Sequence, residues 1–271
     1  GEPDGTWRMG RFAAPRGFEG RMGSMASGLE RYFDSDAERE AYEAFLAEQE
    51  RGVEGFKLAE PALVCRWRMA DKHVPMLNRH IRALSQRTVN GEPLTRNMLS
   101  WVKQHVEWSL AEGDYRERDG VLMLVIDVNG NAAMTVGAYE PLADTSLAAL
   151  ADRASTARAE AAETDIAPEL VGAVTGGRLL LGARPDEHVC GAATLVEQLA
   201  ATRGIDVEQV LGADAGTEGV DAFLAAAGPD AAFFLVSDEH GVVPAHGGES
   251  PSAKDAATVE FLSAGIRKLF S

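Results

Sequence analysis

The segment PMLNRHIRALS, residues 75–85, holds the side chains whose chemistry matters most in this sequence. It reads as the start of a helix that carries Arg79, His80 and Arg82 close together. A guanidinium group is a permanently charged, planar fork of N–H donors, which matches the oxygens of a phosphate or a carboxylate. Whether an arginine of this segment holds such an anion depends on how the neighbouring elements aim it.

No other familiar catalytic or metal-binding motif is present in the sequence. Neither GxxxxGK nor a GxGxxG loop after a strand occurs, so a nucleotide-phosphate cradle is not predicted. The patterns HExxH, CxxC and the nucleophile elbow are also missing, and the six histidines never pair at ligand spacing on one helix. A single histidine such as His105 is more often a structural residue than a catalytic one, so we expect no metal site.

The composition is that of a globular protein with an acidic surface. The chain has 271 residues and a formal net charge of −16, with 25% charged and 45% hydrophobic residues. This length allows one large or two modest domains, and the negative charge argues against a nucleic acid partner, whose phosphates require clustered Lys and Arg. A local basic excess occurs at the N-terminus, where residues 1–34 are predicted to form a partly flexible arm of unassigned role.

The two cysteines, Cys65 and Cys190, lie far apart in the sequence and match no metal spacing. They are typical of small buried hydrophobic residues in a reducing compartment. No apolar run approaches the roughly 18 residues of a membrane span, and the N-terminus lacks a signal-peptide pattern. We therefore expect a cytoplasmic protein that has no membrane partner.

The first half predicts a mixed domain of helices and strands over residues 35–142. The segment SDAE offers a capping box, with Ser35 as the N-cap residue and Glu38 three residues later. A helix is therefore predicted from Ser35 to about Arg51. PALVCRWRM alternates apolar and polar positions as a half-buried strand does, and VPML is predicted as a short second strand. Asn78 is then predicted to cap a helix.

A longer helix and a hairpin complete this domain. The helix is predicted from Thr95 to about Ala111, because apolar residues recur there at helical spacing. These residues are Met98, Leu99, Val102, Val106 and Leu110. The apolar strand VLMLVID precedes the pair Asn129-Gly130, the strongest hairpin signal in the sequence, and NAAMTVGAY returns as the partner strand.

The second half repeats the mixture after an Ala-rich charged segment, residues 143–164, which predicts a helical linker. A second α+β domain is predicted over 165–271. It contains the hairpin LVGAV-TGG-RLLLG, a helix from about Gly191 to Arg203, DVEQVL, a helix near 218–227, the strands AAFFLVS and GVVPA, and a final helix from Ala253 to Phe270. The fold class is therefore α+β with two domains, and a ligand site is expected at the seam between them.

The order of these elements resembles that of the fold-type IV enzymes, which use pyridoxal phosphate. This family includes branched-chain and D-amino-acid aminotransferases and aminodeoxychorismate lyase. GVEGFKL (52–58), the strand pair and RHIRALS (79–85) resemble the family's FEG, strand pair and His-x-x-Arg-Leu helix start. The segments from ELVGAV to GIDVEQ, followed by FFLVSDEHGVVPA, resemble the elements around its phosphate cup. The resemblance spans about 50–245 and implies a two-domain fold of the D-amino-acid aminotransferase type.

The resemblance implies an arginine that binds the cofactor phosphate three residues after the histidine, but this position is Ala83. Arg82 stands one residue early, and one residue turns a helix by about 100°, so Arg82 points elsewhere. Arg82 is nevertheless the nearest match to the phosphate-binding arginine. Arg79 is also near, and we expect the family's contact to be absent unless the local backbone shifts.

Three further positions match residues that the family uses for its cofactor. Gly191 keeps the glycine of the family's PG-x-TR loop, at a helix start whose amides would face the phosphate, while the loop's hydroxyl position is Ala193. Asp165 matches the glutamate that pairs with the pyridine nitrogen, with Glu163 as a neighbouring candidate. The resemblance thus implies a cofactor-binding set of Arg82, Asp165, Gly191 and Thr194, and a weak anion site near 191–194.

The lysine that would form the Schiff base is missing from the place where the resemblance requires it. It should lie between the last strand of the first domain and the carboxylate at Asp165. The lysines of the chain are Lys57, Lys72, Lys103, Lys254 and Lys268, and none falls between Leu142 and Asp165. We therefore expect no catalytic residue and no bound pyridoxal phosphate.

Three functions stay open at this point. The chain is either a degenerate relative that binds a small or anionic molecule between its domains, or a structural or partner-binding homodimer. The alternative is an active aminotransferase or lyase that uses a lysine from an unexpected position, such as Lys57 or Lys72, with pyridoxal phosphate as its cofactor. The resemblance implies a homodimer in each case.

Overall fold

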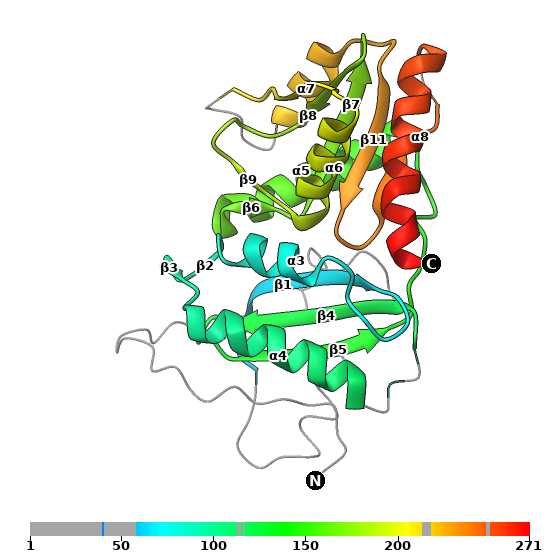
Figure 1. The fold of residues 1–271 in the computed structure, drawn as a ribbon. Coiled ribbons are helices and arrows are strands. Elements are labelled where there is room, and N and C mark those ends of the chain that lie inside the picture. Colours follow the sequence, from blue (N-terminus) through cyan, green and yellow to red (C-terminus); the bar gives the residue numbers. More distant parts are fainter. Residues whose placement is uncertain (1–39, 41–57, 113–114, 116, 213–217, 248–249) are drawn as a thin grey trace. The chain divides into compact units, whose positions relative to one another are not determined.

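A computed structural model describes residues 40, 58–112, 115, 117–212, 218–247 and 250–271 (Figure 1). Several predictions therefore lie outside the described residues: the N-terminal arm (1–34), almost all of the helix from Ser35 to Arg51, and Lys57. The elements in chain order are β1 (Pro61–Met69), α3 (Leu77–Leu84), β2 (Thr88–Val89), β3 (Glu92–Pro93), α4 (Arg96–Glu112), β4 (Gly120–Asp127), β5 (Ala132–Gly137), α5 (Leu147–Thr164), β6 (Ile166–Ala167), β7 (Glu169–Thr175), β8 (Arg178–Leu181), β9 (His188–Val189), α6 (Gly191–Thr202), β10 (Val207–Gln209), α7 (Gly219–Ala227), β11 (Ala232–Ser237), β12 (Gly241–Pro244), α8 (Ala253–Arg267) and the 3₁₀ turn η2 (Lys268–Phe270).

The contacts divide these elements into two units. Among the described residues, unit 1 holds 58–74, 89–93 and 100–140, and unit 2 holds 75–88, 94–99 and 141–271. The predicted boundary at 142 lies close to the change of unit after residue 140. The segment 75–88, which the sequence placed in the first domain, is grouped with unit 2, because α3 packs against α6.

Unit 1 is built on the antiparallel sheet β1-β4-β5, against which α4 packs. Cys65 of β1 lies opposite Leu124 of β4, which in turn lies opposite Met134 of β5. The predicted apolar stripe of α4 is buried at Met98, Val102, Val106 and Leu110. The strand and helix periodicities of the sequence are therefore confirmed here.

The predicted hairpin at Asn129-Gly130 is present between β4 and β5. Gly130 has a φ of 77°, a conformation that suits glycine. Asp127 is fully buried, and its carboxylate accepts hydrogen bonds from the backbone amides of Asn129 and Asn131 at 2.9 and 2.8 Å. The same side chain accepts from the Ala59 amide at 2.9 Å. The aspartate therefore has a structural role in this turn.

The predicted strand VPML is wrong. Ala70 and His73 form only an isolated bridge, and α3 begins directly after Met76. Pro75 has no N–H for a strand ladder, and Met76 has a φ of 63°. Met76 is thus the N-cap residue, and Asn78, which the sequence predicted as the cap, lies inside the helix.

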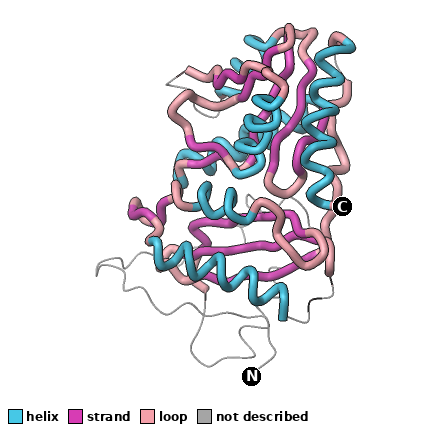
Figure 2. Tube along the Cα trace, viewed as in Figure 1, coloured by secondary structure: helices cyan, strands magenta, loops and turns pink. Residues whose placement is uncertain are grey.

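Unit 2 has a five-stranded sheet of order β10-β8-β7-β11-β12 with helices on both faces (Figure 2). Its central strands send alternate residues to opposite sides, as the period of a strand requires. Leu170 and Val174 join one apolar cluster with residues of α6 and α8, whereas Val171 and Ala173 join another with residues of α5 and α7. Two mixed units of helices and largely antiparallel sheets confirm the predicted α+β class.

The close packing of unit 2 predicts a large effect of a single methyl group at Gly172. An added Cβ would lie 2.3 Å from Cζ of Phe234, whose ring is buried. We therefore expect Gly172→Ala to lower the free energy of unfolding by about 1–3 kcal/mol, as overpacking does. Urea unfolding measures this loss, and Gly212→Ala is the control, since no atom lies within 4 Å there. Equal stability of both variants would contradict the packing.

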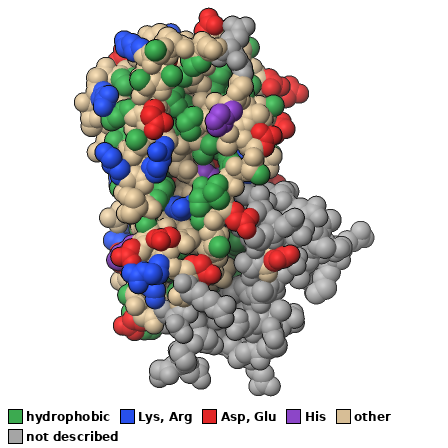
Figure 3. Space-filling view, turned by 90° about the vertical axis from the view of Figure 1, so that its right-hand side faces the viewer, with side chains coloured by type: hydrophobic (Ala, Val, Ile, Leu, Met, Phe, Trp, Pro, Cys, Tyr) green, Lys and Arg blue, Asp and Glu red, His purple; other side chains and the backbone are tan. Residues whose placement is uncertain are grey.

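The described helices include none that is long and apolar enough to cross a lipid bilayer. On the face drawn in Figure 3, the basic side chains of the described residues occur singly or in small groups between acidic ones.

Candidate functional site

The N-terminus of α6 is the element that the resemblance marks as a phosphate site. The chain reaches it through β9, which pairs with β6, and turns at Cys190, the N-cap residue with extended backbone. A helix start with open amides attracts anions, because its N–H groups and the helix dipole both present positive charge. What the chain places in front of these amides therefore decides what the site can hold.

The carboxylate of Asp238 lies at this helix start. Its Oδ1 accepts a hydrogen bond from the Ala192 amide at 2.7 Å, and its Oδ2 lies 3.2 Å from Nδ1 of His80. The His80 side chain is fully buried, whereas 14% of the Asp238 side chain is exposed. Burial alone would raise the pKa of Asp238, but His80, the Ala192 amide and the charge of Arg87 together hold it below its ordinary value.

Asp238 reaches this position because the turn between β11 and β12 is fixed. The hydroxyl of Ser237 accepts hydrogen bonds from the amides of Glu239 and His240 at 3.1 and 3.2 Å. Ser237 is itself held in the sheet, opposite Glu169 at the start of β7. The first residue after β11 is therefore directed at α6.

Helix α3 docks on the same end of α6 through several contacts. An added Cβ on Gly191 would lie 2.7 Å from His80 Nδ1 and 3.2 Å from the His80 backbone nitrogen, so a glycine is needed for this close approach. Arg79 donates to the Thr194 hydroxyl at 3.0 Å and to the Gln198 side chain. The Thr194 hydroxyl in turn donates to the Gly191 carbonyl at 2.7 Å. Both hydrogen-bonding functions of Thr194 are thus used within the protein.

The four predicted cofactor residues do not come together. Gly191 and Thr194 lie on the first turn of α6, as the sequence placed them. Arg82 is exposed on α3, where its Nε donates to the Asn78 carbonyl of the same helix at 3.3 Å. Asp165 is exposed at the C-terminal end of α5 with a φ of 62°, the position of a turn residue. The structure thus brings Arg79, rather than Arg82, to α6.

Sequence reasoning missed the two residues that define this helix start, Asp238 and His80. Asp238 stands directly after the apolar strand AFFLVS, in a segment whose resemblance to the phosphate cup was noted. An acidic residue at the edge of a presumed anion site was the available signal. His80 belongs to the helix-start motif of the sequence, but its partner is 158 positions away and cannot be read from local spacing.

A second polar cluster lies at the same edge of the unit 2 sheet. Arg153 of α5 donates to the buried Glu169 at 2.8 Å, and its Nη2 lies 3.3 Å from Nε2 of His240. An arginine can only donate, so Nε2 of His240 accepts in this contact. An oxygen of the buried Glu239 carboxylate lies 3.8 Å from the same ring nitrogen. These residues pin α5 to the β11–β12 turn.

Cys190, the cysteine at this edge, is not suited to act as a nucleophile. Cys190 is fully buried, and burial together with the Asp238 charge raises the pKa of its thiol well above the ordinary value. A protonated thiol is a poor nucleophile and a poor metal ligand. No group of three or more His, Cys, Asp or Glu side chains with metal-binding geometry occurs in the described part of the chain.

The two described lysines of unit 2 lie at its surface. Both Lys254 and Lys268 are exposed. Lys254 lies at the C-terminal end of β7, since its Nζ would be 3.3 Å from a Cβ on Gly177 in the turn after this strand. Asp238 lies at the opposite end, since it directly follows Ser237, which pairs with the first residue of β7. Seven residues of strand, at roughly 3.3 Å each, separate these two ends by about 20 Å. Lys254 is thus remote from the α6 N-terminus.

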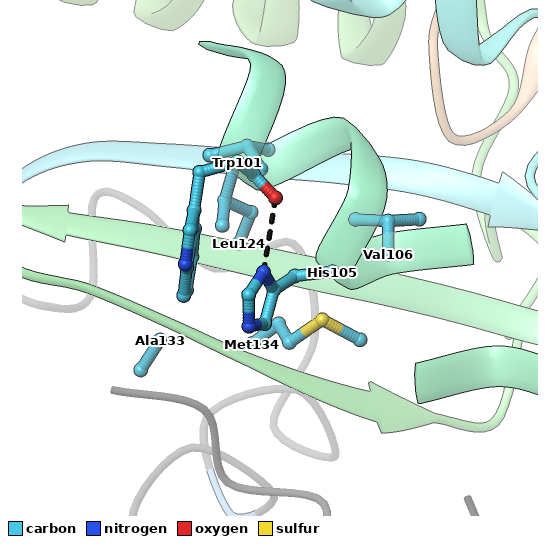
Figure 4. Close-up of a pocket in the computed structure, with 7 residues that line it drawn as sticks. Trp101, His105, Val106, Leu124, Ala133 and Met134 are labelled. Atoms are coloured by element: carbon cyan, nitrogen blue, oxygen red, sulfur yellow. Dashed lines mark hydrogen bonds between the residues drawn. The ribbon is translucent and has the colours of Figure 1, made fainter. Parts of the chain in front are cut away.

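A small apolar pocket in unit 1 lies between α4 and the strands β4 and β5 (Figure 4). The rings of Trp101 and His105 stack on one side of it, with centroids 3.5 Å apart, and His105 Nδ1 lies 3.1 Å from the Trp101 carbonyl. Burial lowers the pKa of His105 and so favours the neutral ring, although the hydrogen bond to Trp101 acts in the opposite direction. The other lining residues are Val102, Val106, Leu124, Ala133 and Met134, so the pocket offers packing surface and no catalytic pair.

Comparisons with known proteins bear on the fold. A protein described as a candidate branched-chain amino acid aminotransferase from Thermotoga maritima is similar with a TM-score of 0.51 and 14% identity, over 97% of this chain and 95% of that chain. A mutant branched-chain amino acid aminotransferase from Thermobaculum terrenum has a TM-score of 0.50 and 15% identity, over 82% and 89% of the two chains. No family model and no curated protein matches the sequence. The chain thus has the fold of the fold-type IV enzymes, which confirms the predicted resemblance at the level of fold.

The residues around α6 do not fit a bound pyridoxal phosphate. The amide of Ala192 already donates to Asp238, a group of the same charge as a phosphate. Ala193 is fully buried and has no hydroxyl, and Arg79 donates to Thr194 and Gln198. The described geometry therefore offers neither an open amide at Ala192 nor an arginine aimed at it.

The lowered pKa of Asp238 predicts a specific dependence of stability on pH. A carboxyl whose pKa is lower in the folded than in the unfolded protein stabilises the fold above the unfolded value, and this contribution is lost as the pH falls through the folded value. We therefore expect Asp238→Asn to be less stable than the natural protein above about pH 5, with a gap that narrows below the ordinary pKa of 3.8.

Urea unfolding of the two proteins between pH 7 and pH 3 measures this gap. Asp221→Asn, in the exposed first turn of α7, removes the same charge elsewhere and is the control. A gap between natural protein and Asp238→Asn that is constant over the whole range would contradict the assignment.

Proposed function

We propose that this chain is an aminotransferase-like protein that has lost pyridoxal phosphate chemistry and acts by binding rather than by catalysis. The observation that carries the proposal is the missing Schiff-base lysine. The chain passes from the end of β5 to the start of α5 through residues 138–146 and then forms a single helix up to Thr164. No lysine occurs between Leu142 and Asp165, so covalent attachment by the family's route is not available.

A transaminase needs one lysine to hold its cofactor and to move a proton between two carbon atoms. Water or a neighbouring side chain does not replace both functions, because neither is held in position for them. The described lysines of unit 2 support the proposal, since both are exposed and Lys254 lies far from the N-terminus of α6. The exposed positions of Arg82 and Asp165 support it as well.

The test is an aminotransfer assay with added pyridoxal phosphate, 2-oxoglutarate and a panel of amino acids, including the branched-chain ones. We expect no transfer above the rate that free pyridoxal phosphate gives alone, while an active branched-chain aminotransferase in the same assay shows turnover. Saturable turnover would refute the proposal. Lys57→Ala and Lys72→Ala would then decide whether one of these lysines serves the active-enzyme alternative.

The sequence also predicts a homodimer with a small or anionic ligand, and both stay proposals. Light scattering at micromolar concentration is expected to give about twice the monomer mass of 28.9 kDa. A mass near 28.9 kDa across this range would contradict the dimer. Mass spectrometry of the purified protein under native conditions reports a small-molecule ligand that survives purification.

A further inference from the structure

The positive charge at the N-terminus of α6 is neutralised by a carboxylate of the same chain. The Ala192 amide donates to Asp238 at 2.7 Å, and the second oxygen of this carboxylate lies 3.2 Å from the His80 ring. The positive end of a helix normally recruits an anion from outside or a side chain from inside. Here the side chain comes from a different element, the turn after β11, and it carries a full negative charge.

We infer that Asp238 is a built-in anion whose carboxylate closes the N-terminus of α6 to phosphate-bearing ligands. The inference deepens the proposed function and rests on it. The missing lysine removes covalent attachment of the cofactor, whereas Asp238 removes the non-covalent binding of its phosphate group. Restoring a lysine alone would therefore not restore cofactor binding.

The exclusion follows from charge and from hydrogen bonding. A phosphate carries about −1.5 to −2 charges at pH 7, and to use the Ala192 amide it would have to approach within a few ångströms of the Asp238 carboxylate. Two anions at such a distance in a partly buried site cannot both stay ionised without a cation between them.

The basic side chains near α6 already have partners within the chain. His80 contacts Asp238 itself, and Arg79 donates to Thr194 and Gln198. Arg87 is 5% exposed and pairs with Glu160 at 3.5 Å. Arg87 is thus paired with a carboxylate, and Arg79 uses its two Nη atoms on the neutral side chains of Thr194 and Gln198.

Asp238 lies within reach of solvent, since 14% of its side chain is exposed. Removing its charge therefore opens a place that dissolved ions can enter. Serine is the informative replacement, because its small hydroxyl can donate to a phosphate and can also cap the helix. Asparagine is the conservative one, since it keeps the shape of the side chain and an acceptor for the Ala192 amide.

The experiment titrates inorganic phosphate into the natural protein, Asp238→Ser, Asp238→Asn and the control Asp221→Asn at pH 7.5 and constant ionic strength. Chemical shifts of the Gly191–Thr194 amides and calorimetry report binding. We expect Asp238→Ser to bind at least about tenfold more tightly than the natural protein, which corresponds to about 1.4 kcal/mol. Asp238→Asn is expected to gain about threefold and Asp221→Asn nothing. Pyridoxal phosphate should follow the same order, whereas pyridoxal, which lacks the phosphate, should not distinguish the proteins.

The inference is overturned if the natural protein binds phosphate at 191–194 as tightly as Asp238→Ser, or if neither variant gains affinity. Circular dichroism and thermal unfolding establish that each variant is folded. If Asp238→Ser does not fold, the affinity of Asp238→Asn for phosphate decides: a gain supports the inference and no gain overturns it. Phosphate binding by the natural protein without aminotransfer would sink this inference and leave the proposed function standing.

Discussion

Replacing Arg158 by methionine is expected to lower the free energy of unfolding by about 3–5 kcal/mol. Arg158 is 5% exposed and donates to both carboxylate oxygens of Glu187, at 3.2 and 3.1 Å, and to the Gly182 carbonyl at 3.2 Å. The Glu187 side chain is only 3% exposed. Methionine fills the space but leaves the carboxylate charged, buried and without its principal cation, and this stranded charge causes the loss. Urea unfolding at pH 7 measures it.

Two further variants separate the buried pair from a surface pair. Arg178→Met breaks a contact of 3.3 Å to Glu208, but both side chains are more than half exposed, so the expected change is at most about 1 kcal/mol. The double variant Arg158→Met with Glu187→Leu should recover part of the loss, because an apolar pair leaves no stranded charge. A loss below about 1 kcal/mol in the single variant would contradict the role of this ion pair.

Replacing Gly191 by alanine is expected to cost about 3 kcal/mol and to loosen α3. The added Cβ would lie 2.7 Å from the His80 ring and 3.3 Å from the backbone carbon of Arg79, so the helix itself has to move. Alanine favours helices over glycine by up to about 1 kcal/mol, which would act in the opposite direction. A net loss therefore reports the contact between the helices. Amide hydrogen exchange of residues 77–84 and urea unfolding measure the two effects.

Gly212→Ala is the matched control for this experiment, since nothing lies within 4 Å of a Cβ there. It should leave both the stability and the exchange of α3 unchanged. If Gly191→Ala keeps α3 as protected as in the natural protein, the glycine does not serve the close approach. Gly191 would then have the role that the resemblance implied, which is to leave the backbone amides at the start of α6 open to an anion.

Much of the fold could be predicted because it depends on local chemistry. The pair Asn129-Gly130 fixes a hairpin by its backbone preference, and the apolar spacing of α4 fixes its buried side. Such signals do not depend on distant residues, so they are readable from the sequence.

The assignment of α3 was not predictable in the same way. Its sequence indicates a helix, but its partner is chosen by Gly191, Thr194 and Gln198, which stand more than 100 residues later. The strand predicted just before it failed because Pro75 and Met76 form a turn with a left-handed residue. Periodicity over four residues cannot separate a short strand from such a turn.

The position of the candidate site could be predicted from the sequence, but the group that lies in it could not. The glycine of the CGAAT segment located the helix start correctly, yet the group in front of it, Asp238, belongs to a turn 46 residues after Ala192. The sequence shows that the helix N-terminus can attract an anion. Only the tertiary structure shows that the anion is the protein's own carboxylate.

The central claim is that this fold no longer carries pyridoxal phosphate on a lysine, and borohydride reduction followed by peptide mass mapping tests it most directly. The natural protein is incubated with excess pyridoxal phosphate, reduced, digested and analysed for pyridoxyl-lysine. The account predicts no stoichiometric adduct on any single lysine and no absorbance at roughly 410–430 nm before reduction, where a lysine Schiff base of this cofactor absorbs. One pyridoxyl group per chain on one lysine, together with that absorbance, would contradict it.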